Sequence, residues 1–261
     1  MIDDRARADT RASVARVYED AGVATEYLDK RLRYAWQRLL HSRQRACLQR
    51  LIDERSPVRV LELAPGPARL AAELTGVRSA TMLENSAAMA RIARERLSAQ
   101  GLASTWTVLE GDAFQADRFL DREPVDLAFT FRFIRHFRSD ERHRLYAQLH
   151  RALMPGGLLV FDVVNRVIRA RIDGDARPSS PDELAVYDAT YSSAELKVEM
   201  KDHGFETLRL VPVIRHFGLQ SRLSHKLVRA SAPVPDALVR FLEVIPSNQP
   251  LEWVAVCCKA G

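Results

Sequence analysis

The chain has little cysteine, with three residues among 261, at positions 47, 257 and 258. Cys47 stands alone, and Cys257 and Cys258 are neighbours in an apolar run that we expect to form a strand. None of them has the spacing of metal ligands or of a disulfide framework. The cysteines therefore predict neither a structural disulfide nor a bound metal.

Long apolar runs are also missing, so no stretch approaches the length of a membrane span. The start, "MIDDRARADTR", is charged from its third residue and lacks the apolar core of a signal peptide. We therefore expect a cytoplasmic protein without a membrane partner. Hydrophobic content of 47% and charged content of 28% are ordinary for a globular protein, which argues against disorder.

A net charge of +5 raises the question of a nucleic-acid partner. The arginines, however, are interleaved with acids, as in "ARIARERL", and this is typical of solvated helix faces. The charge thus favours anionic partners without pointing to nucleic acid.

Two regions differ in their pattern. Residues 1–56 repeat apolar side chains at helical spacing and predict an N-terminal helical cap or lid. Residues 57–261 alternate short apolar runs with amphipathic stretches, which predicts one α/β domain with a doubly wound, seven-stranded, mostly parallel sheet, helices on both faces and an antiparallel last strand. The expected strands are 58–63, 79–83, 104–110, 125–131, 158–164, 206–214 and 253–259.

Helices are expected between these strands, at 68–74, 87–100, 114–120 and 140–153. Residues 166–191 read as a loop, and Ser192 to Glu195 form a capping box that opens a helix ending at Gly204. An insertion around 217–250 has two further helical stretches. This insertion is too long for a hairpin turn, and we expect it to form a second cap over the ligand site at the strand ends.

The turn after the first strand, in "VRVLELAPGPARLAAEL", has one glycine, Gly66, between two prolines. Ala64 and Ala68 occupy the places where a dinucleotide-binding turn has its other glycines. Each proline also removes a backbone N–H that a pyrophosphate would need. S-Adenosylmethionine carries no phosphate, so Gly66 for close approach and Glu62 for its ammonium group could suffice.

With these residues the chain resembles a class I S-adenosylmethionine-dependent methyltransferase of the small-molecule branch, from about Val58 to Phe161. "VLELAPGPAR" matches the first motif of that family in its acid and its middle glycine only. The resemblance implies a Rossmann-like fold with S-adenosyl-L-methionine as cofactor. It also implies that Glu62, Ala64 and Gly66 contact this cofactor.

A second motif, "ATMLENSAAMARIARERL", ends its strand at Glu84, eighteen positions after Gly66. The resemblance implies that this carboxylate holds the ribose hydroxyls, although dinucleotide folds place an acid there too. Asn85 could contact the cofactor or, with Ser86, cap the next helix. Met89 could touch the adenine or belong to the core.

A third motif, "LEGDAF", follows the third strand. The resemblance implies that Asp112 accepts a hydrogen bond from the adenine amino group and that the Ala113 N–H donates to the ring. An ordinary turn is the alternative interpretation of Gly111 and Asp112.

The fourth motif is "PVDLAFTFRFIRHF", in which the strand is expected to end near Phe131, with Thr130 as a candidate contact of the cofactor. Nucleic-acid amino methyltransferases of this class carry an Asn or Asp followed by two prolines and an aromatic residue here. "TFRF" offers no such acceptor, which argues against base methylation. "LHRALMPGGLLVFD" matches the turn and fifth strand typical of the small-molecule branch, and its role is architectural.

His136, a few residues beyond a strand end, is the candidate general base, with a packed or solvated histidine as the alternative. The letters "IRHF" recur at 214–217. If both copies lie at one sheet edge, Arg132, Arg135 and Arg215 could hold an anionic acceptor, and otherwise they are surface arginines. Tyr187 and Tyr191 are further candidates for contact with the acceptor.

The sequence therefore predicts a methyltransferase that acts on an oxygen or nitrogen of a small, polar or anionic acceptor, such as a sugar or secondary metabolite. An RNA methyltransferase is an alternative that only the basic charge favours. A protein that binds the cofactor without transferring methyl is another. The sequence does not indicate the oligomeric state.

Overall fold

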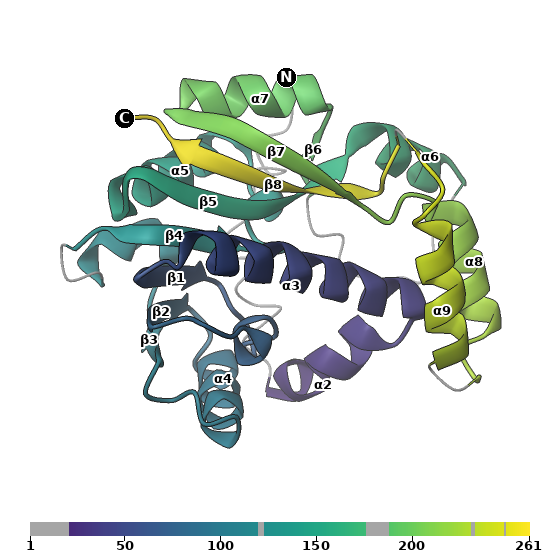
Figure 1. Ribbon diagram of the computed structural model, residues 1–261, viewed down its shortest axis with the longest axis horizontal. Helices are drawn as coiled ribbons and strands as arrows, with labels where there is room; N and C mark the ends of the chain where they lie inside the picture. The colour runs from purple at the N-terminus through teal and green to yellow at the C-terminus, as the bar shows by residue number, and fades with distance from the viewer. Residues whose placement is uncertain (1–20, 120–122, 176–187, 231–232, 248) are drawn as a thin grey trace, which may run out of the picture.

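A computed structural model describes residues 21–119, 123–175, 188–230, 233–247 and 249–261 of the chain (Figure 1). Its centre is one sheet with the strand order β3-β2-β1-β4-β5-β8-β7, and β6 pairs with β5 outside this path. The strands are β1 (Arg59–Leu63), β2 (Ser79–Glu84), β3 (Trp106–Glu110), β4 (Val125–Thr130), β5 (Leu153–Asn165), β6 (Thr190–Tyr191), β7 (Phe205–Val213) and β8 (Glu252–Lys259).

The strand directions confirm the predicted doubly wound arrangement. β1 runs parallel to β2 and β4, β3 runs parallel to β2, and β5 runs parallel to β4. The last strand, β8, is antiparallel to both β5 and β7, as predicted. The carboxyl ends of β1 to β5 and of β7 therefore lie at one edge of the sheet, where ligands bind in such folds. β6 was not predicted, because two residues are too few to show a pattern.

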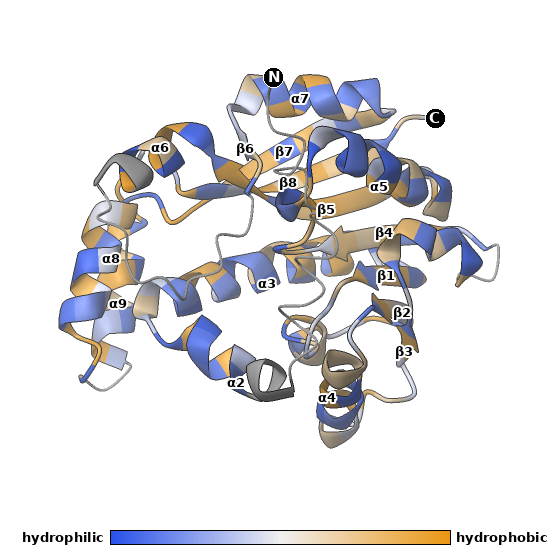
Figure 2. Cartoon of the chain, turned by 180° about the vertical axis from the view of Figure 1, so that it is seen from behind, coloured by the Kyte–Doolittle hydropathy of each residue, from blue (hydrophilic) through white to orange (hydrophobic). Residues whose placement is uncertain are grey.

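Helices cover both faces of the sheet, and two apolar clusters form the core. On one face α3 (Ala35–Arg55) and α4 (Ala87–Ala99) pack through residues such as Leu48 and Ala93 against Val60. On the other face α5 (Ser139–Ala152) and α7 (Ser193–Asp202) pack through residues such as Leu145 against Leu61. In Figure 2 the strands are largely hydrophobic and the helices are two-sided. None of the described helices is long and apolar enough to cross a membrane.

Most expected helices are present. α2 (Ala21–Leu32) and α3 come from the N-terminal helical pattern, and α8 (Phe217–Lys226) and α9 (Pro233–Leu242) form the insertion. α3 contacts α2, α8 and α9, which lie at one end of it (Figure 1). Ser192 caps α7 by accepting a hydrogen bond from the Glu195 N–H, and Gly204 follows with φ +77°. The short stretch after β3 is a 3-10 helix, η3 (Ala113–Arg118).

Two expectations were wrong. The predicted helix 68–74 is only a 3-10 turn, η2 (Ala71–Glu73), because Ala68 adopts φ +53° and a right-handed helix cannot include it. The segment after β5, expected as a loop, begins with a helix, α6 (Arg166–Asp175). Asn165 starts this helix by accepting a hydrogen bond from the Val167 N–H at 3.1 Å. Residues 176–187 of this segment lie outside the described residues.

Candidate active site

The turn after β1 has the backbone of a three-glycine turn although it contains one glycine. Ala64, Gly66 and Ala68 adopt φ values of +49°, +57° and +53°. For each alanine this left-handed conformation costs roughly 1–2 kcal/mol, and such strain persists mainly where function requires the shape. A Cβ added at Gly66 would meet no atom of the described chain within 4 Å, so the turn is open to the close approach of a ligand.

Glu84, at the end of β2, holds this turn. Its carboxylate accepts hydrogen bonds from the Gly66 N–H and the Ser86 N–H, each at 2.9 Å. Burial raises the pKa of Glu84, and these N–H donors oppose the rise. The acid thus lies beside Gly66, as the sequence spacing suggested.

Glu62 is 4% exposed, and its Oε2 has no hydrogen-bond partner in the described part of the chain. Burial raises the pKa of Glu62 to about 8, with the positive charge of Arg69 opposing and the negative charge of Glu84 adding to the rise. Without a ligand, the carboxyl group is therefore mostly protonated at neutral pH. Thr130, at the end of β4, is fully buried, and its Oγ1 likewise has no hydrogen-bond partner among the described residues.

The other predicted cofactor residues lie at the ends of β2 and β3. Asp112 caps η3, accepting a hydrogen bond from the Phe114 N–H at 2.9 Å, and Ala113 is buried beside it. Asn85 is exposed, and Ser86 is the residue that caps α4. Met89 is 1% exposed. The topology therefore brings the three acids Glu62, Glu84 and Asp112 to the ends of adjacent strands.

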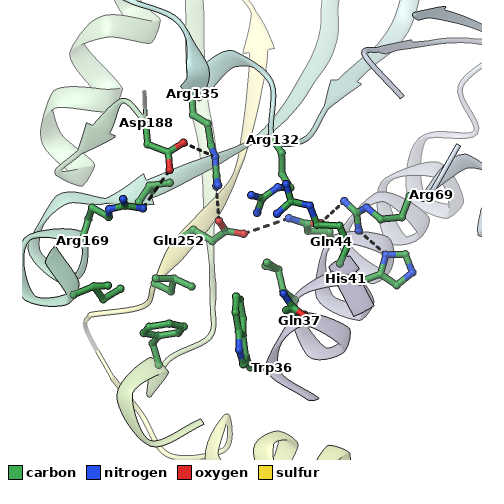
Figure 3. Close-up of a pocket in the computed structure, with 16 residues that line it drawn as sticks. Trp36, Gln37, His41, Gln44, Arg69, Arg132, Arg135, Arg169, Asp188 and Glu252 are labelled. Carbon is green, nitrogen blue, oxygen red and sulfur yellow. Dashed lines mark hydrogen bonds and ion pairs between the residues drawn. The ribbon is translucent and has the colours of Figure 1, made fainter. Parts of the chain in front are cut away.

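A cavity of about 350 Å³ lies beyond β4 and β5, between α3 and α6 (Figure 3). Its apolar lining comes from side chains such as Trp36, Leu40, Val164, Ile172, Phe217 and Leu251. Its charged lining comprises five arginines but only two carboxylates, namely Arg31, Arg69, Arg132, Arg135, Arg169, Asp188 and Glu252. Gln37, His41 and Gln44 of α3 complete the wall. The charged part of the cavity lining is therefore mainly positive, and the rest of the lining is largely apolar.

Arg135 is the centre of an ion cluster in this wall. Its Nη1 lies 3.0 Å from Asp162 Oδ2 and 3.0 Å from Glu252 Oε2, and its Nε lies 3.1 Å from Asp188 Oδ1. Burial raises the pKa of Glu252 to about 7, with the charge of Asp162 adding to the rise and Arg135 opposing it. Burial also favours the neutral form of Asp188, but the hydrogen bond from His136 and the charge of Arg135 lower its pKa to about 2.

A chain of hydrogen bonds extends from this cluster to the turn after β1 (Figure 3). Gln44 donates to Glu252 at 3.3 Å and accepts from Arg69 at 2.9 Å. Arg69 also lies 2.6 Å from Nδ1 of His41, whose Nε2 lies 3.0 Å from Glu73. Arg69 lines the cavity, and its charge also acts on Glu62. It therefore links the two halves of the candidate site.

Arg132 lies two residues after the end of β4 and has an unusual conformation. Its φ is +59°, and its backbone N–H donates to Asp162 Oδ1 at 2.6 Å. The side chain lines the cavity and points toward its middle (Figure 3), and its buried Nε has no hydrogen-bond partner in the described chain. Burial and the like charges of Arg135 and Arg31 lower the pKa of Arg132 to about 10.

The structure separates the remaining predicted residues from this cavity. His136 is 4% exposed, and its Nδ1 lies 3.1 Å from Asp188 Oδ1. The Tyr191 hydroxyl donates to Glu199 of α7 at 2.7 Å. Arg215 follows β7 at the same sheet edge. The described residues that line the cavity do not include Arg215, His136 or Tyr191. Tyr187 lies outside the described residues.

Several residues of the site were not predicted from the sequence. They are Trp36, His41 and Gln44 of α3, Arg69 after the turn, Asp162, Asp188 and Glu252. Only Arg69 carried a local signal, because it follows the Gly66 turn. The others come together through tertiary structure.

The family model described as "Methyltransferase domain" matches residues 60–157. A magnesium protoporphyrin IX methyltransferase from Synechocystis PCC 6803, solved with S-adenosylhomocysteine, has a TM-score of 0.63 at 11% identity, covering 96% of this chain and 100% of that one. A methyltransferase from Thermotoga maritima, described as a possible histamine N-methyltransferase, has a TM-score of 0.61 at 20% identity, covering 92% of this chain and 97% of that one.

The mitomycin 7-O-methyltransferase has a TM-score of 0.53 at 16% identity, and the match covers 83% of this chain but only about half, 53%, of that one. No curated protein sequence matches significantly. Residues 60–157 are thus similar to a methyltransferase domain, and the chain has the fold of the class I S-adenosylmethionine-dependent methyltransferases. The cofactor of this class is S-adenosylmethionine, as solved neighbours with bound cofactor or its product illustrate.

Proposed function

We propose that this protein transfers a methyl group from S-adenosylmethionine to an oxygen or nitrogen of a small anionic acceptor. The observation that carries this proposal is the division of one sheet edge into an acidic half, at β1 to β3, and an arginine-rich cavity beyond β4 and β5. A cationic cofactor fits the first half and an anionic acceptor fits the second.

The residues of the acidic half fit the cofactor. Glu62 Oε2, without a partner in the described chain, can accept a hydrogen bond from the α-ammonium group, and Gly66 allows close approach. We assign the ribose to Glu84 and the adenine to Asp112 and Ala113. Ala64, Asn85, Met89 and Thr130 would complete the wall around it.

The cofactor supplies an activated methyl group on its sulfonium. The chain needs mainly to orient the acceptor in line with this methyl and to exclude water. Arg31 of α2, Trp36 of α3 and Phe217 of α8 all line the cavity, so the N-terminal helices and the insertion would close it as a lid. His136 lies behind Asp188, and we assign it support of the cavity wall.

Calorimetry with S-adenosylhomocysteine tests the cofactor half of this proposal. We expect binding to the wild-type chain and weaker binding to Glu84→Ala and Asp112→Ala, with circular dichroism unchanged. Arg91→Ala, which removes an exposed arginine of α4, is the matched control and should bind as the wild type does. Tighter binding of NAD than of S-adenosylhomocysteine would overturn the assignment.

A further inference from the structure

Arg132 combines two unfavourable features at one position. Its backbone is held in the left-handed region by Asp162, and its buried Nε makes no hydrogen bond within the described chain. The side chain as a whole is half-buried, but a buried nitrogen of a charged group without an acceptor is costly, and an unsatisfied buried atom in a native structure needs an explanation. Strained backbone conformations also cluster at ligand sites. An anionic ligand in the cavity would satisfy this side chain.

The other arginines of the cavity differ from Arg132 in their partners. Arg135 contacts three carboxylates, and Arg169 lies 3.4 Å from Asp188. Arg69 has the neutral partners His41 and Gln44. Arg31 is half-buried and lies over the ring of Tyr27, 5.2 Å from its centroid. Arg132 is therefore the arginine of this wall whose charge is best placed to receive an anion from outside the chain.

The groups in the cavity wall that could act as a base are already engaged. His41 accepts from Arg69 at Nδ1 and faces Glu73 with Nε2. Asp188 contacts Arg135, His136 and Arg169. Glu252 receives hydrogen bonds from Arg135 and Gln44. Such a wall suits a nucleophile that is ionised on its own at neutral pH, because no proton has to be removed from it.

We infer that the acceptor is an oxyacid, a carboxylate or phosphate, methylated on its ionised oxygen to give a methyl ester, with Arg132 as the anchor of the acid group. This inference rests on the proposed function. A lone pair of the acid oxygen forms the new C–O bond, and the C–S bond of the sulfonium breaks with its electron pair going to sulfur. The positive charge of the sulfonium and one negative charge of the acid cancel, and no proton is released. A low-dielectric cavity favours such charge neutralisation.

A hydroxyl acceptor is the competing hypothesis, with Glu252 as its base. In that reaction one proton is released for each methyl group transferred. The proton balance distinguishes the two for either acid. For a carboxylate acceptor the stability of the product in alkali does so as well, because carboxylic methyl esters release methanol in alkali, whereas methyl ethers and methyl phosphodiesters do not.

The first experiment measures binding by the full chain saturated with S-adenosylhomocysteine. Benzoate and phenyl phosphate are the anionic probes, and benzamide is the neutral one. We expect at least one anion to bind and benzamide not to bind detectably. Arg132→Gln should weaken anion binding roughly 30-fold or more. Equal binding of benzamide, or no binding of either anion, would overturn the inference.

Two variants control this measurement. Arg171→Gln removes an exposed arginine from the same helix as Arg169 and should leave anion binding unchanged. Arg132→Lys keeps the charge and should retain part of the affinity. Binding of S-adenosylhomocysteine is measured first in every variant, which shows that the fold is intact. If the wild-type chain does not bind S-adenosylhomocysteine, the proposed function itself is contradicted. If S-adenosylhomocysteine binds and Arg132→Gln binds the anion as tightly as the wild type does, only this inference is contradicted.

The second experiment examines the product. The acid that binds is incubated with methyl-labelled S-adenosylmethionine, beside benzyl alcohol as the hydroxyl counterpart, and proton release is followed with an indicator dye. We expect no proton released for each turnover with either acid and, where the acid is benzoate, label that alkali releases as methanol. One proton per turnover, alkali-stable label on benzoate, or labelling of benzyl alcohol in preference to the bound acid would overturn the inference.

Discussion

The two halves of the sheet edge differ in charge and in construction. At β1, β2 and β3 the acids Glu62, Glu84 and Asp112 each lie at or just after the end of a strand, and all three come from the continuous segment 62–112. Beyond β4 and β5 the wall is rich in arginine, and its parts come from α3, α6, α8 and β8 as well. The acidic half is therefore built from local segments and the cationic half from distant ones. This difference suggests that the cofactor half is general to the fold and the acceptor half is particular to this chain.

The largest effect is expected where the cationic half is held together. Replacing Arg135 by Met leaves Asp162, Asp188 and Glu252 without their shared cation, and breaking such a buried cluster costs about 3–5 kcal/mol. Denaturant unfolding measures this loss. Arg166→Met, which removes a half-exposed pair with Glu195, should cost at most about 1 kcal/mol. Similar losses in both variants would mean that the cluster does not stabilise the cavity.

In the acidic half, Glu62→Gln should separate binding from stability. It removes the acceptor for the cofactor's ammonium group, so affinity for S-adenosylhomocysteine should fall by about tenfold or more. The pKa of Glu62 is about 8 in the fold and about 4.3 when unfolded, so the ionising side chain destabilises the ligand-free protein as pH rises through that window. The melting temperature of Glu62→Gln relative to that of the wild type should therefore be higher at pH 9 than at pH 6. An equal difference at both values would contradict the raised pKa.

The same carboxyl group predicts a proton linkage in the wild-type chain. Glu62 must ionise to pair with an ammonium group, so binding of S-adenosylhomocysteine should tighten from pH 6 to pH 8, by at most about tenfold per unit. Calorimetry in buffers of different ionisation enthalpy should detect release of close to one proton near pH 6.5. Glu62→Gln is the control, and pH-independent binding by the wild type would argue against this role for Glu62.

The smallest effect concerns the turn itself. Ala68→Gly relieves a left-handed alanine but makes the unfolded chain more flexible, so stability should change by less than about 1 kcal/mol in either direction. Ala71→Gly, in η2 and fully buried, should destabilise by about 1 kcal/mol or more, because it gains no relief. If both variants lost the same amount, the turn would carry no strain at Ala68.

The sequence predicted the sheet and its cofactor half because their signals are local. Apolar runs separated by amphipathic helices reveal parallel strands, and an acid at or just after the end of each of β1, β2 and β3 is visible from the spacing. The helix expected at 68–74 was wrong because nothing in the letters shows that Ala68 takes a positive φ. Alanine usually favours helices, and here the turn overrides that propensity.

The acceptor half was only partly visible. Arg132 and Arg135 were candidates because they follow β4, and both line the cavity. Glu252 and Gln44 are 208 positions apart in sequence and meet only because β8 and α3 pack at the same edge. The repeated "IRHF" illustrates the limit, because Arg215 lies at the predicted edge but its backbone N–H is directed to Glu243 of the insertion. The two copies of the motif thus lie at the same edge of the sheet, but their arginines have different neighbours.

Pro65 and Pro67 separate the three left-handed residues of the turn after β1. Each proline fixes its own φ, and alanine samples fewer backbone states than glycine. The loop therefore has little conformational freedom, and its backbone is already in the binding conformation before a ligand arrives. Compared with a turn of three glycines, this loop loses less conformational entropy when a nucleoside binds. It can therefore bind the nucleoside tightly although it is short and offers few N–H donors.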